Sequence, residues 1–201
     1  MVVDILWAGP TPDGENGADA TLVLAHGAGA GMDSVGMNDL ADALASRGIR
    51  TARFEFAYMA ARRQGVRRPP PRAETLAGEY LAAVEQVGGL PFIGGRSMGG
   101  RVATLVADEL GPPGVVCFGY PFHPPAKPEQ LRTAHLENLR TPMMVVQGTR
   151  DEFETRDEVA GYGLSPAIEI TWVEGANHGL STKKALAEAA DAASRWLSSA
   201  R

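Results

Sequence analysis

The sequence predicts an α/β fold, a three-layer sandwich in which a mostly parallel β-sheet is flanked by helices on both faces. Three observations predict it. Short apolar runs alternate with longer segments whose apolar residues recur every three or four positions. A chain of 201 residues suits one domain with a substantial core, here taken as residues 1–201. No internal repeat or low-complexity linker interrupts the alternation.

The predicted elements follow one another along the chain. Strand-like apolar runs begin near Val2, Thr21, Thr51, Pro91, Val115, Met143 and Ile168. Between them lie segments that each carry one apolar stripe, as a helix packed on a sheet does. The clearest stripes are Met37, Leu40, Ala41, Leu44 and Ala45, then Ala73, Leu76, Ala77, Tyr80, Leu81, Val84 and Val87, and lastly Leu186, Ala189, Ala190, Ala193, Trp196 and Leu197. We also expect helices over residues 101–106 and around His135.

Composition and charge exclude several classes of protein. The net charge of −5 argues against nonspecific nucleic-acid binding. The single cysteine, Cys117, excludes an internal disulfide framework and fits a reducing compartment, so we expect a cytoplasmic protein. The N-terminal residues lack the basic region and long apolar core of a signal peptide or membrane anchor. We expect a monomer or homodimer without a membrane or nucleic-acid partner.

Ser97 is the candidate nucleophile. It is the central residue of a Gly-x-Ser-x-Gly motif formed with Gly95 and Gly99, which follows an apolar strand and precedes a helix-like segment. A sharp strand-to-helix turn exposes the residue at its apex, and small residues two positions before and after let the backbones pass. The context therefore predicts a serine hydroxyl presented at the end of the sheet.

A serine nucleophile needs a base and an acid that orients the base. His178 lies in a polar loop after the strand-like run at Ile168, and Asp151 follows the run at Met143. Because both runs and the one before Ser97 are parallel strands, their carboxyl ends would meet at one edge of the sheet. Three other acids lie close to Asp151 in sequence, and we favour Asp151 because it is nearest to the strand end. The competitors are Glu152, Glu154 and Asp157.

A Gly-rich loop after the strand at Thr21 is the candidate oxyanion hole. Backbone N–H groups in such a loop can face a developing negative charge. We assign one donor to Ala28, with Gly29 as the alternative, and the second to Met98, which follows the nucleophile.

These four pieces, in this order, resemble the α/β-hydrolase superfamily, and the resemblance spans the chain from about Thr21 to the C-terminal helix. The sequences HGAGAGMD at 26–33 and GYPFHPP at 119–125 are similar to those of small lidless, dienelactone-hydrolase-like members, a largely uncharacterised subgroup that includes relatives of a chromatin-associated complex subunit. One difference is that dienelactone hydrolases use a cysteine where this chain has Ser97. Many hydrolases insert a cap domain between the strands that begin here at Val115 and Met143, and the roughly two dozen residues available predict an open site without one.

The resemblance implies a serine hydrolase that cleaves carboxylic esters, or thioesters, of small molecules through an acyl-enzyme. Two alternatives remain open. One is a noncatalytic interaction module on the same scaffold, and the other is an acyltransferase or peptidase that uses the same triad.

Candidate substrate contacts are residues expected near the pocket mouth. Tyr58 follows the end of one predicted strand, and Tyr120, Phe122 and His123 follow the end of the strand that begins at Val115. His123 either contacts the substrate or packs its own loop. The full set is Gly29, Tyr58, Tyr120, Phe122 and His123. We interpret His26 as structural, an imidazole that hydrogen-bonds backbone and holds the Gly-rich loop.

The segment 62–72 is basic and Pro-rich. We expect an exposed loop, with recognition of an anionic substrate or partner as the alternative interpretation. Its arginines are Arg62, Arg63, Arg67, Arg68 and Arg72.

No cofactor and no metal are expected. The dinucleotide fingerprint Gly-x-Gly-x-x-Gly fails whether it is counted from Gly27 or Gly29, because its last position falls on Met32 or Ser34. The sequence contains neither a phosphate-binding loop motif nor histidines and cysteines at zinc spacing.

Overall fold

The computed structural model describes residues 3–11 and 18–200. They form a seven-stranded sheet in the order β1-β3-β2-β4-β5-β6-β7, in which only β1 runs antiparallel to its neighbour. The strands are β1 (Ile5–Ala8), β2 (Ala20–Ala25), β3 (Ile49–Phe54), β4 (Phe92–Arg96), β5 (Val115–Phe118), β6 (Met143–Gly148) and β7 (Ile168–Val173). The first predicted strand begins at Ile5, and Val2 lies outside the described residues.

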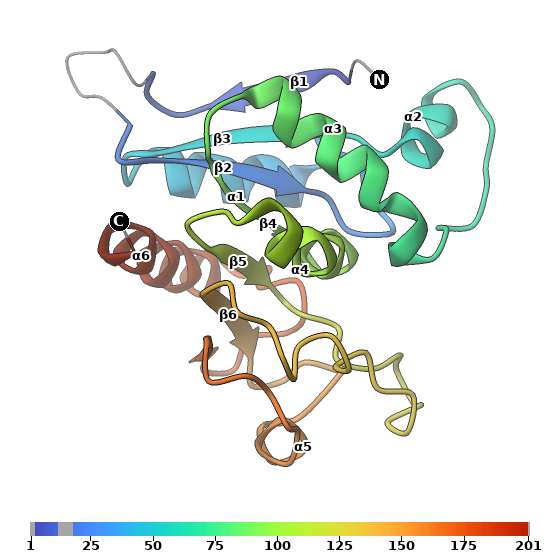
Figure 1. The fold of residues 1–201 in the computed structure, drawn as a ribbon, viewed down its shortest axis with the longest axis vertical. Coiled ribbons are helices and arrows are strands. Elements are labelled where there is room, and N and C mark those ends of the chain that lie inside the picture. The colour runs from blue at the N-terminus through green and yellow to red at the C-terminus, as the bar shows by residue number, and fades with distance from the viewer. Residues whose placement is uncertain (1–2, 12–17, 201) are drawn as a thin grey trace.

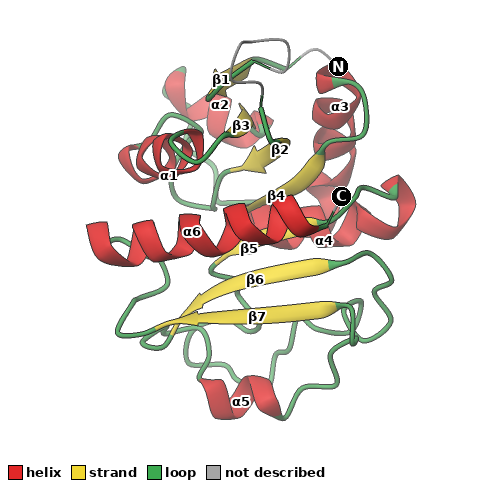
Figure 2. Cartoon of the chain, turned by 90° about the vertical axis from the view of Figure 1, so that its left-hand side faces the viewer, coloured by secondary structure: helices red, strands yellow, loops and turns green. Residues whose placement is uncertain are grey.

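Helices cover both faces of the sheet. They are α1 (Val35–Ala45), α2 (Ala57–Arg63), α3 (Ala77–Val87), α4 (Met98–Leu110), α5 (Arg156–Ala160) and α6 (Lys183–Ser199), with a 3-10 helix η1 (Ala73–Leu76) before α3. Helices α1 and α6 pack together on one face, and α3 and α4 pack together on the other; in Figure 2, α6 lies in front of the sheet and α4 behind it. The predicted three-layer α/β sandwich is therefore confirmed.

The sheet separates two apolar cores. Successive side chains of a strand point to opposite faces, so Val23 and Ala25 of β2 join the core under α3 and α4 while Leu22 and Leu24 join the core under α1 and α6. Each of these four side chains is fully buried. Because both faces are covered, β2 is an unbroken apolar run from Leu22 to Ala25, as expected for a central parallel strand.

Tyr80 ties α3 to two central strands. Its fully buried hydroxyl lies 2.7 Å from the carbonyl oxygen of Gly94 on β4 and 3.0 Å from that of Val23 on β2, and it accepts a 2.8 Å hydrogen bond from the Gly94 N–H. The ring packs edge-on against Phe54 of β3. One side chain thus satisfies buried backbone groups and fixes the helix over the sheet.

Several local predictions differ from the structure. Helix α2 takes up Arg62 and Arg63, so the basic loop is confined to residues 64–72. Helices α2 and α5 have seven and five residues, too short for an apolar period to reveal them. His135 was expected in a helix but lies in a turn, with its Nε2 atom 2.9 Å from the Thr104 hydroxyl.

Because β2 to β7 are parallel, their carboxyl ends lie along one edge of the sheet. In Figure 1, β2 runs toward the right-hand side of the molecule, where α2 and the loop after it also lie. The segment 119–142 connects β5 to β6 and contains no helix or strand, so no cap domain is inserted there. No helix in the described ranges is both long and apolar enough to cross a bilayer.

Candidate active site

Ser97 occupies a strained turn between β4 and α4. Its φ and ψ are +47° and −117°, a conformation that non-glycine residues rarely adopt. Two backbone hydrogen bonds hold it there: its N–H donates to the Phe118 carbonyl at 3.1 Å, and its own carbonyl accepts from the Arg101 N–H at 3.0 Å. The strand on one side and the helix on the other therefore fix the direction of the hydroxyl.

The two glycines of the motif are required by close backbone contacts. A Cβ atom added at Gly99 would lie 2.5 Å from the carbonyl oxygen of His26, and one at Gly95 would lie 2.7 Å from that of Ala25. Both carbonyls belong to the end of β2 and the loop after it, so the turn presses directly on the neighbouring strand. Any side chain at either position would push the turn away from the sheet.

The structure brings Ser97, His178 and Asp151 together from the ends of β4, β7 and β6. His178 Nε2 lies 2.9 Å from Ser97 Oγ, and His178 Nδ1 lies 2.7 Å from Asp151 Oδ2. The Asp151 carboxylate is fully buried, while the imidazole is 15% exposed. A carboxylate accepts only, so Nδ1 carries the proton and Nε2 is free to accept the serine proton.

Asp151, and none of its three sequence competitors, is the acid that contacts His178. It is held by the Gln147 amide, which donates to Oδ2 at 2.6 Å, and by the Phe153 N–H, which donates to Oδ1 at 2.9 Å. The Phe153 ring also lies over the imidazole, with ring centroids 4.1 Å apart. Sequence reasoning had no means of identifying Gln147, because it lies inside a buried strand.

Glu154 lies beside this pair as a second buried carboxyl. Its Oε2 accepts a hydrogen bond from the Phe122 N–H at 3.3 Å, and Gln147 bridges it to Asp151. Burial, and then the negative charge of Asp151, raise the pKa of Glu154 to about 9. A protonated Glu154 carries no charge at neutral pH, so it adds no second negative charge beside His178.

Gly119 makes room for His178. It has a φ of +70°, and a Cβ atom there would lie 2.5 Å from the His178 carbonyl oxygen and 3.2 Å from Nδ1. The only sequence signal for this role is a glycine directly after a buried strand.

The candidate oxyanion donors Ala28 and Met98 both border the pocket that contains Ser97. Across the described residues, neither N–H donates a hydrogen bond to another protein group. The N–H of Met98 is free because Met98 opens α4, where the first N–H groups have no intrahelical partner. Gly29, the alternative donor, lines the other pocket beside Ser97, and a Cβ atom added there would meet no atom within 4 Å.

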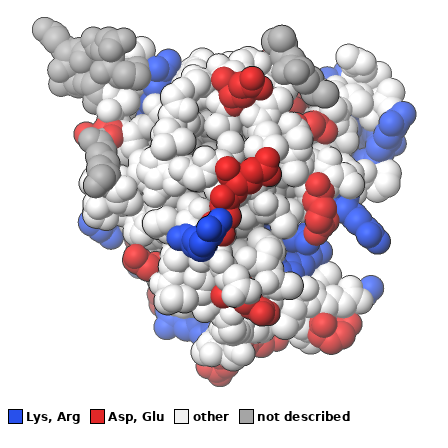
Figure 3. All heavy atoms as spheres, in the orientation of Figure 1, with Lys and Arg blue, Asp and Glu red and all other residues white. Residues whose placement is uncertain are grey.

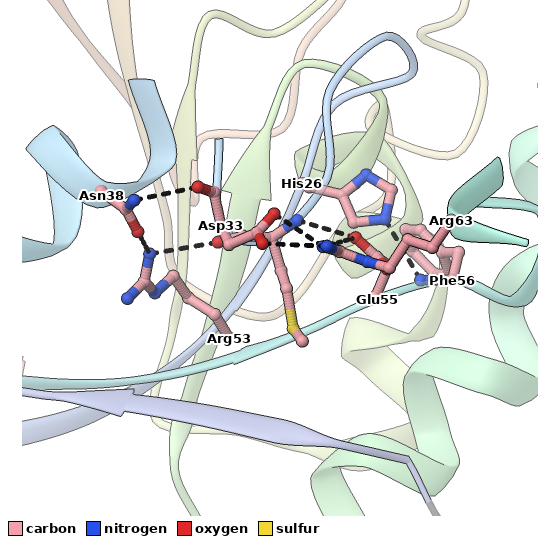
Figure 4. Close-up of polar contacts among 8 residues, drawn as sticks. His26, Asp33, Asn38, Arg53, Glu55, Phe56 and Arg63 are labelled. Carbon is pink, nitrogen blue, oxygen red and sulfur yellow. Dashed lines mark hydrogen bonds and ion pairs between the residues drawn. The ribbon is translucent and has the colours of Figure 1, made fainter. Parts of the chain in front are cut away.

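An ion-pair network contacts the loop that carries Ala28 at its far end, at Met32 and Asp33 (Figure 4). The Arg63 guanidinium of α2 pairs with Asp33 and with Glu55, each with a contact of 2.6 Å. Glu55 also accepts a hydrogen bond from the Met32 N–H at 3.2 Å. The strand β3, the helix α2 and the far end of the loop are therefore joined through one guanidinium.

A second part of the network fixes the start of α1. Arg53 donates to the Asn38 side-chain oxygen at 2.5 Å, and Asn38 donates back to the Asp33 carbonyl at 2.9 Å (Figure 4). The end of the loop and the start of α1 are thus anchored to β3.

His26 and Tyr58 support the same loop. The His26 Nδ1 atom lies 2.7 Å from the Gly27 carbonyl, and Nε2 accepts from the Phe56 N–H at 3.1 Å. Burial lowers the pKa of His26, so it stays neutral, as an accepting Nε2 requires. Tyr58 donates to the Ala28 carbonyl at 3.1 Å, and burial raises its pKa to about 12. Tyr58 thus holds the loop, which corrects the expectation of a substrate contact.

Three other expected substrate contacts are also corrected. Tyr120 and Phe122 are fully buried and His123 is 4% exposed, and none of them lines either pocket beside Ser97. The chain turns inward after β5, so the two rings join the core, and the Tyr120 hydroxyl donates to the Arg132 carbonyl. His123 packs its loop, with Nδ1 2.8 Å from the Pro124 carbonyl.

Two pockets meet at Ser97, and they share Ala28 and Phe153 as walls. The first, of about 550 Å³, contains His178 and is mainly apolar, with Val35, Met37 and Phe118 among its lining residues. The second, of about 400 Å³, contains Met98 and is lined by prolines and arginines from the loop 64–72 and other segments. No cluster of three or more metal-ligating side chains occurs within residues 3–11 and 18–200.

Comparisons with known proteins agree with this architecture. A family model described as an alpha/beta hydrolase domain matches residues 18–199. Among solved structures, an α/β serine hydrolase without a lid from Xanthomonas campestris has a TM-score of 0.70 at 18% identity, covering 98% of this chain and 87% of that one. A dienelactone hydrolase from Anabaena variabilis has a TM-score of 0.69 at 20% identity, covering 98% and 97%. A monoacylglycerol lipase from Paleococcus ferrophilus has a TM-score of 0.74 at 16% identity over the whole of both chains. At such identities the likeness establishes the fold.

Proposed function

The chain belongs to the α/β-hydrolase family, and from that premise we propose that it is a serine hydrolase of the carboxylesterase type, acting on esters or thioesters of small molecules. The observation that carries the proposal is the continuous relay from Asp151 through His178 to Ser97, with contacts of 2.7 and 2.9 Å.

In the first half-reaction, Ser97 Oγ attacks the ester carbonyl carbon while its proton passes to His178 Nε2. Asp151 stabilises the imidazolium that forms, because its carboxylate is buried against Nδ1. The N–H groups of Ala28 and Met98 donate to the tetrahedral oxyanion. The intermediate collapses when His178 gives the proton to the leaving oxygen, which releases the alcohol and leaves an acyl group on Ser97.

In the second half-reaction, water replaces the alcohol. His178 takes a proton from water as its oxygen attacks the acyl carbon, and a second tetrahedral oxyanion forms in the same place. Collapse returns the proton to Ser97 Oγ and releases the carboxylic acid. The exposed edge of His178 and the absence of a cap over residues 119–141 give water a route to the acyl-enzyme.

Labelling with a fluorophosphonate, followed by intact mass and peptide mapping, tests the proposal. We expect one adduct, on Ser97, together with hydrolysis of 4-nitrophenyl butyrate. Both should vanish in Ser97→Ala and persist in Ser198→Ala, a hydroxyl deletion on α6 where Ser198 bonds only the Ser194 carbonyl. Undiminished hydrolysis by Ser97→Ala would refute the mechanism. Folded wild-type protein that neither reacts nor hydrolyses esters would favour a noncatalytic role for the scaffold.

A further inference from the structure

The basic, Pro-rich segment forms part of the candidate active site. Pro70, Pro71 and Arg72, at the end of the loop 64–72, line the second pocket together with Ser97 and Met98. Figure 3 shows basic side chains along the right-hand edge of the molecule, the side where Figure 1 places α2 and the loop after it. The end of the loop thus borders the pocket that contains the nucleophile.

Two further guanidinium groups reach the same pocket from distant parts of the chain. Arg101 lies on α4, one turn after Ser97, and Arg132 lies in the segment that follows β5. Together with Arg72 they place three cations, from three separate segments, around one cavity of about 400 Å³.

The protein itself neutralises little of this charge. Arg101 pairs with Glu74, whose side chain is 53% exposed, but its buried Nε has no partner. The Arg132 guanidinium forms no ion pair or hydrogen bond with any residue in the described part of the chain. Burial and the neighbouring Arg101 charge lower the pKa of Arg132, and the same two causes lower the pKa of His135 to about 4. The pocket wall therefore carries positive charge in excess.

Partly buried guanidinium groups that lie close together destabilise the free protein, because each loses hydration and repels the other. A carboxylate between them relieves both effects. The planar guanidinium also matches a carboxylate in two parallel hydrogen bonds, which a lysine ammonium does not do.

The position of His178 indicates which half of an ester carries that carboxylate. His178 must donate a proton to the leaving oxygen, so the alcohol lies in the first pocket, which His178 lines. The second pocket does not include His178 but does include both candidate oxyanion donors, Ala28 and Met98. The acyl chain therefore extends from the carbonyl carbon into the arginine-lined pocket.

We propose that the preferred substrates are esters whose acyl part ends in a carboxylate, that is, half-esters of dicarboxylic acids, with Arg72, Arg101 and Arg132 binding the free carboxylate. The inference rests on the proposed function and adds the substrate class. The first pocket is mainly apolar, with Val35, Met37 and Phe118 in its lining, and it has one arginine, Arg96, against three in the second pocket. Its apolar wall and smaller positive charge favour an uncharged alcohol there.

Three aryl esters of similar size, two of 4-nitrophenol and one of 4-hydroxybenzoate, test the inference with the wild-type protein. Mono-4-nitrophenyl glutarate carries a carboxylate on the acyl side, 4-nitrophenyl valerate is neutral, and the valerate ester of 4-hydroxybenzoate carries the charge on the alcohol side. We expect kcat/KM for the glutarate to exceed that for the valerate by ~10-fold or more, mainly through KM, and the preference to shrink at high salt. The charged alcohol should bring no such advantage.

The variants Arg132→Gln and Arg72→Gln should each reduce the glutarate-to-valerate ratio several-fold. Arg72 is exposed, so its replacement carries little risk to folding. The matched control is Arg68→Gln, in the same loop but outside the pocket, and it should leave the ratio unchanged. Equal kcat/KM for glutarate and valerate would overturn the inference, and so would a preference that survives in the double variant. In either case, Ser97-dependent hydrolysis of the valerate would leave the proposed function intact. Hydrolysis of none of the three esters would overturn both.

Discussion

Replacing Glu154 with glutamine tests whether a neutral carboxyl lies beneath the Asp151–His178 pair. In the structure, Glu154 is 2% exposed and shares the Gln147 amide with Asp151. A glutamine keeps the shape, accepts from Gln147 or the Phe122 N–H, and donates to Asp151 in place of the carboxyl proton. The variant therefore removes one titration and preserves the hydrogen bonds.

The magnitude follows from proton linkage. The pKa of Glu154 is about 9 in the folded protein, against an ordinary value of 4.5. Below pH 4.5 both states hold the proton and stability is unaffected. Between about pH 4.5 and 9 the unfolded chain loses the proton and the folded protein keeps it, so the free energy of unfolding falls as pH rises, by about 1.4 kcal/mol per unit. From pH 6 to pH 8 the wild type should lose about 3 kcal/mol through this group, and Glu154→Gln should lose none of it.

Urea denaturation of both proteins at pH 6, 7 and 8 measures this difference. Other titrating groups, such as His26, are present in both proteins and cancel in the comparison. We expect the stability of Glu154→Gln relative to wild type to rise steadily with pH. A relative stability that stays constant within about 0.5 kcal/mol over this range would show that Glu154 ionises normally, and the reasoning would be refuted.

Three other replacements have defined outcomes. Gly99→Ala should destabilise the fold by about 1–3 kcal/mol and slow fluorophosphonate labelling at least ~10-fold, because the new Cβ meets the His26 carbonyl at 2.5 Å. Tyr80→Phe should cost about 1–3 kcal/mol in urea denaturation, because the Gly94 N–H loses its buried acceptor. Glu55→Ala should slow labelling and also lower the urea midpoint, because the Glu55 side chain is only 6% exposed and its loss removes an acceptor from both Arg63 and the Met32 N–H in the loop behind the oxyanion hole.

The three replacements also have clear contrary outcomes. Asp191→Ala breaks a more exposed ion pair, with Arg47, away from the site and should leave labelling unchanged. Equal slowing in it and in Glu55→Ala would contradict a specific role for the loop network. Wild-type stability of Tyr80→Phe would mean that another group takes over the Gly94 N–H. Wild-type labelling of Gly99→Ala would mean that the turn tolerates the displacement.

Local patterns in the sequence were sufficient for the architecture and for the nucleophile's setting. The turn at Ser97 is encoded within a few residues, since an apolar strand, two glycines and an amphipathic segment together favour a sharp strand-to-helix turn. Strands such as β5 are visible as unbroken apolar runs because burial on both faces removes the need for polar alternation. The chain order of Ser97, Asp151 and His178 also follows from the sequence, since each residue comes after its own strand.

The substrate-facing residues were harder to predict. Tyr120 and Phe122 were placed at the pocket by their distance from a strand end, yet the chain turns inward there and buries both rings. The short helices α2 and α5 have seven and five residues, which is fewer than two turns each, so neither shows an apolar period. Sequence distance from a strand end fixes where a loop starts but not which way its side chains turn.

By itself, then, the sequence determined the alternating layers, the strained serine turn and the order of the candidate triad, because each depends on contacts within a few residues or on the period of one element. The tertiary structure was needed to show that Gln147 and Glu154 lie beside Asp151, that Gly119 makes room for the imidazole, and that Arg72, Arg101 and Arg132 share one pocket. The last two join residues tens of positions apart, and all three depend on how whole elements pack and which side chains that packing buries, which no local pattern encodes.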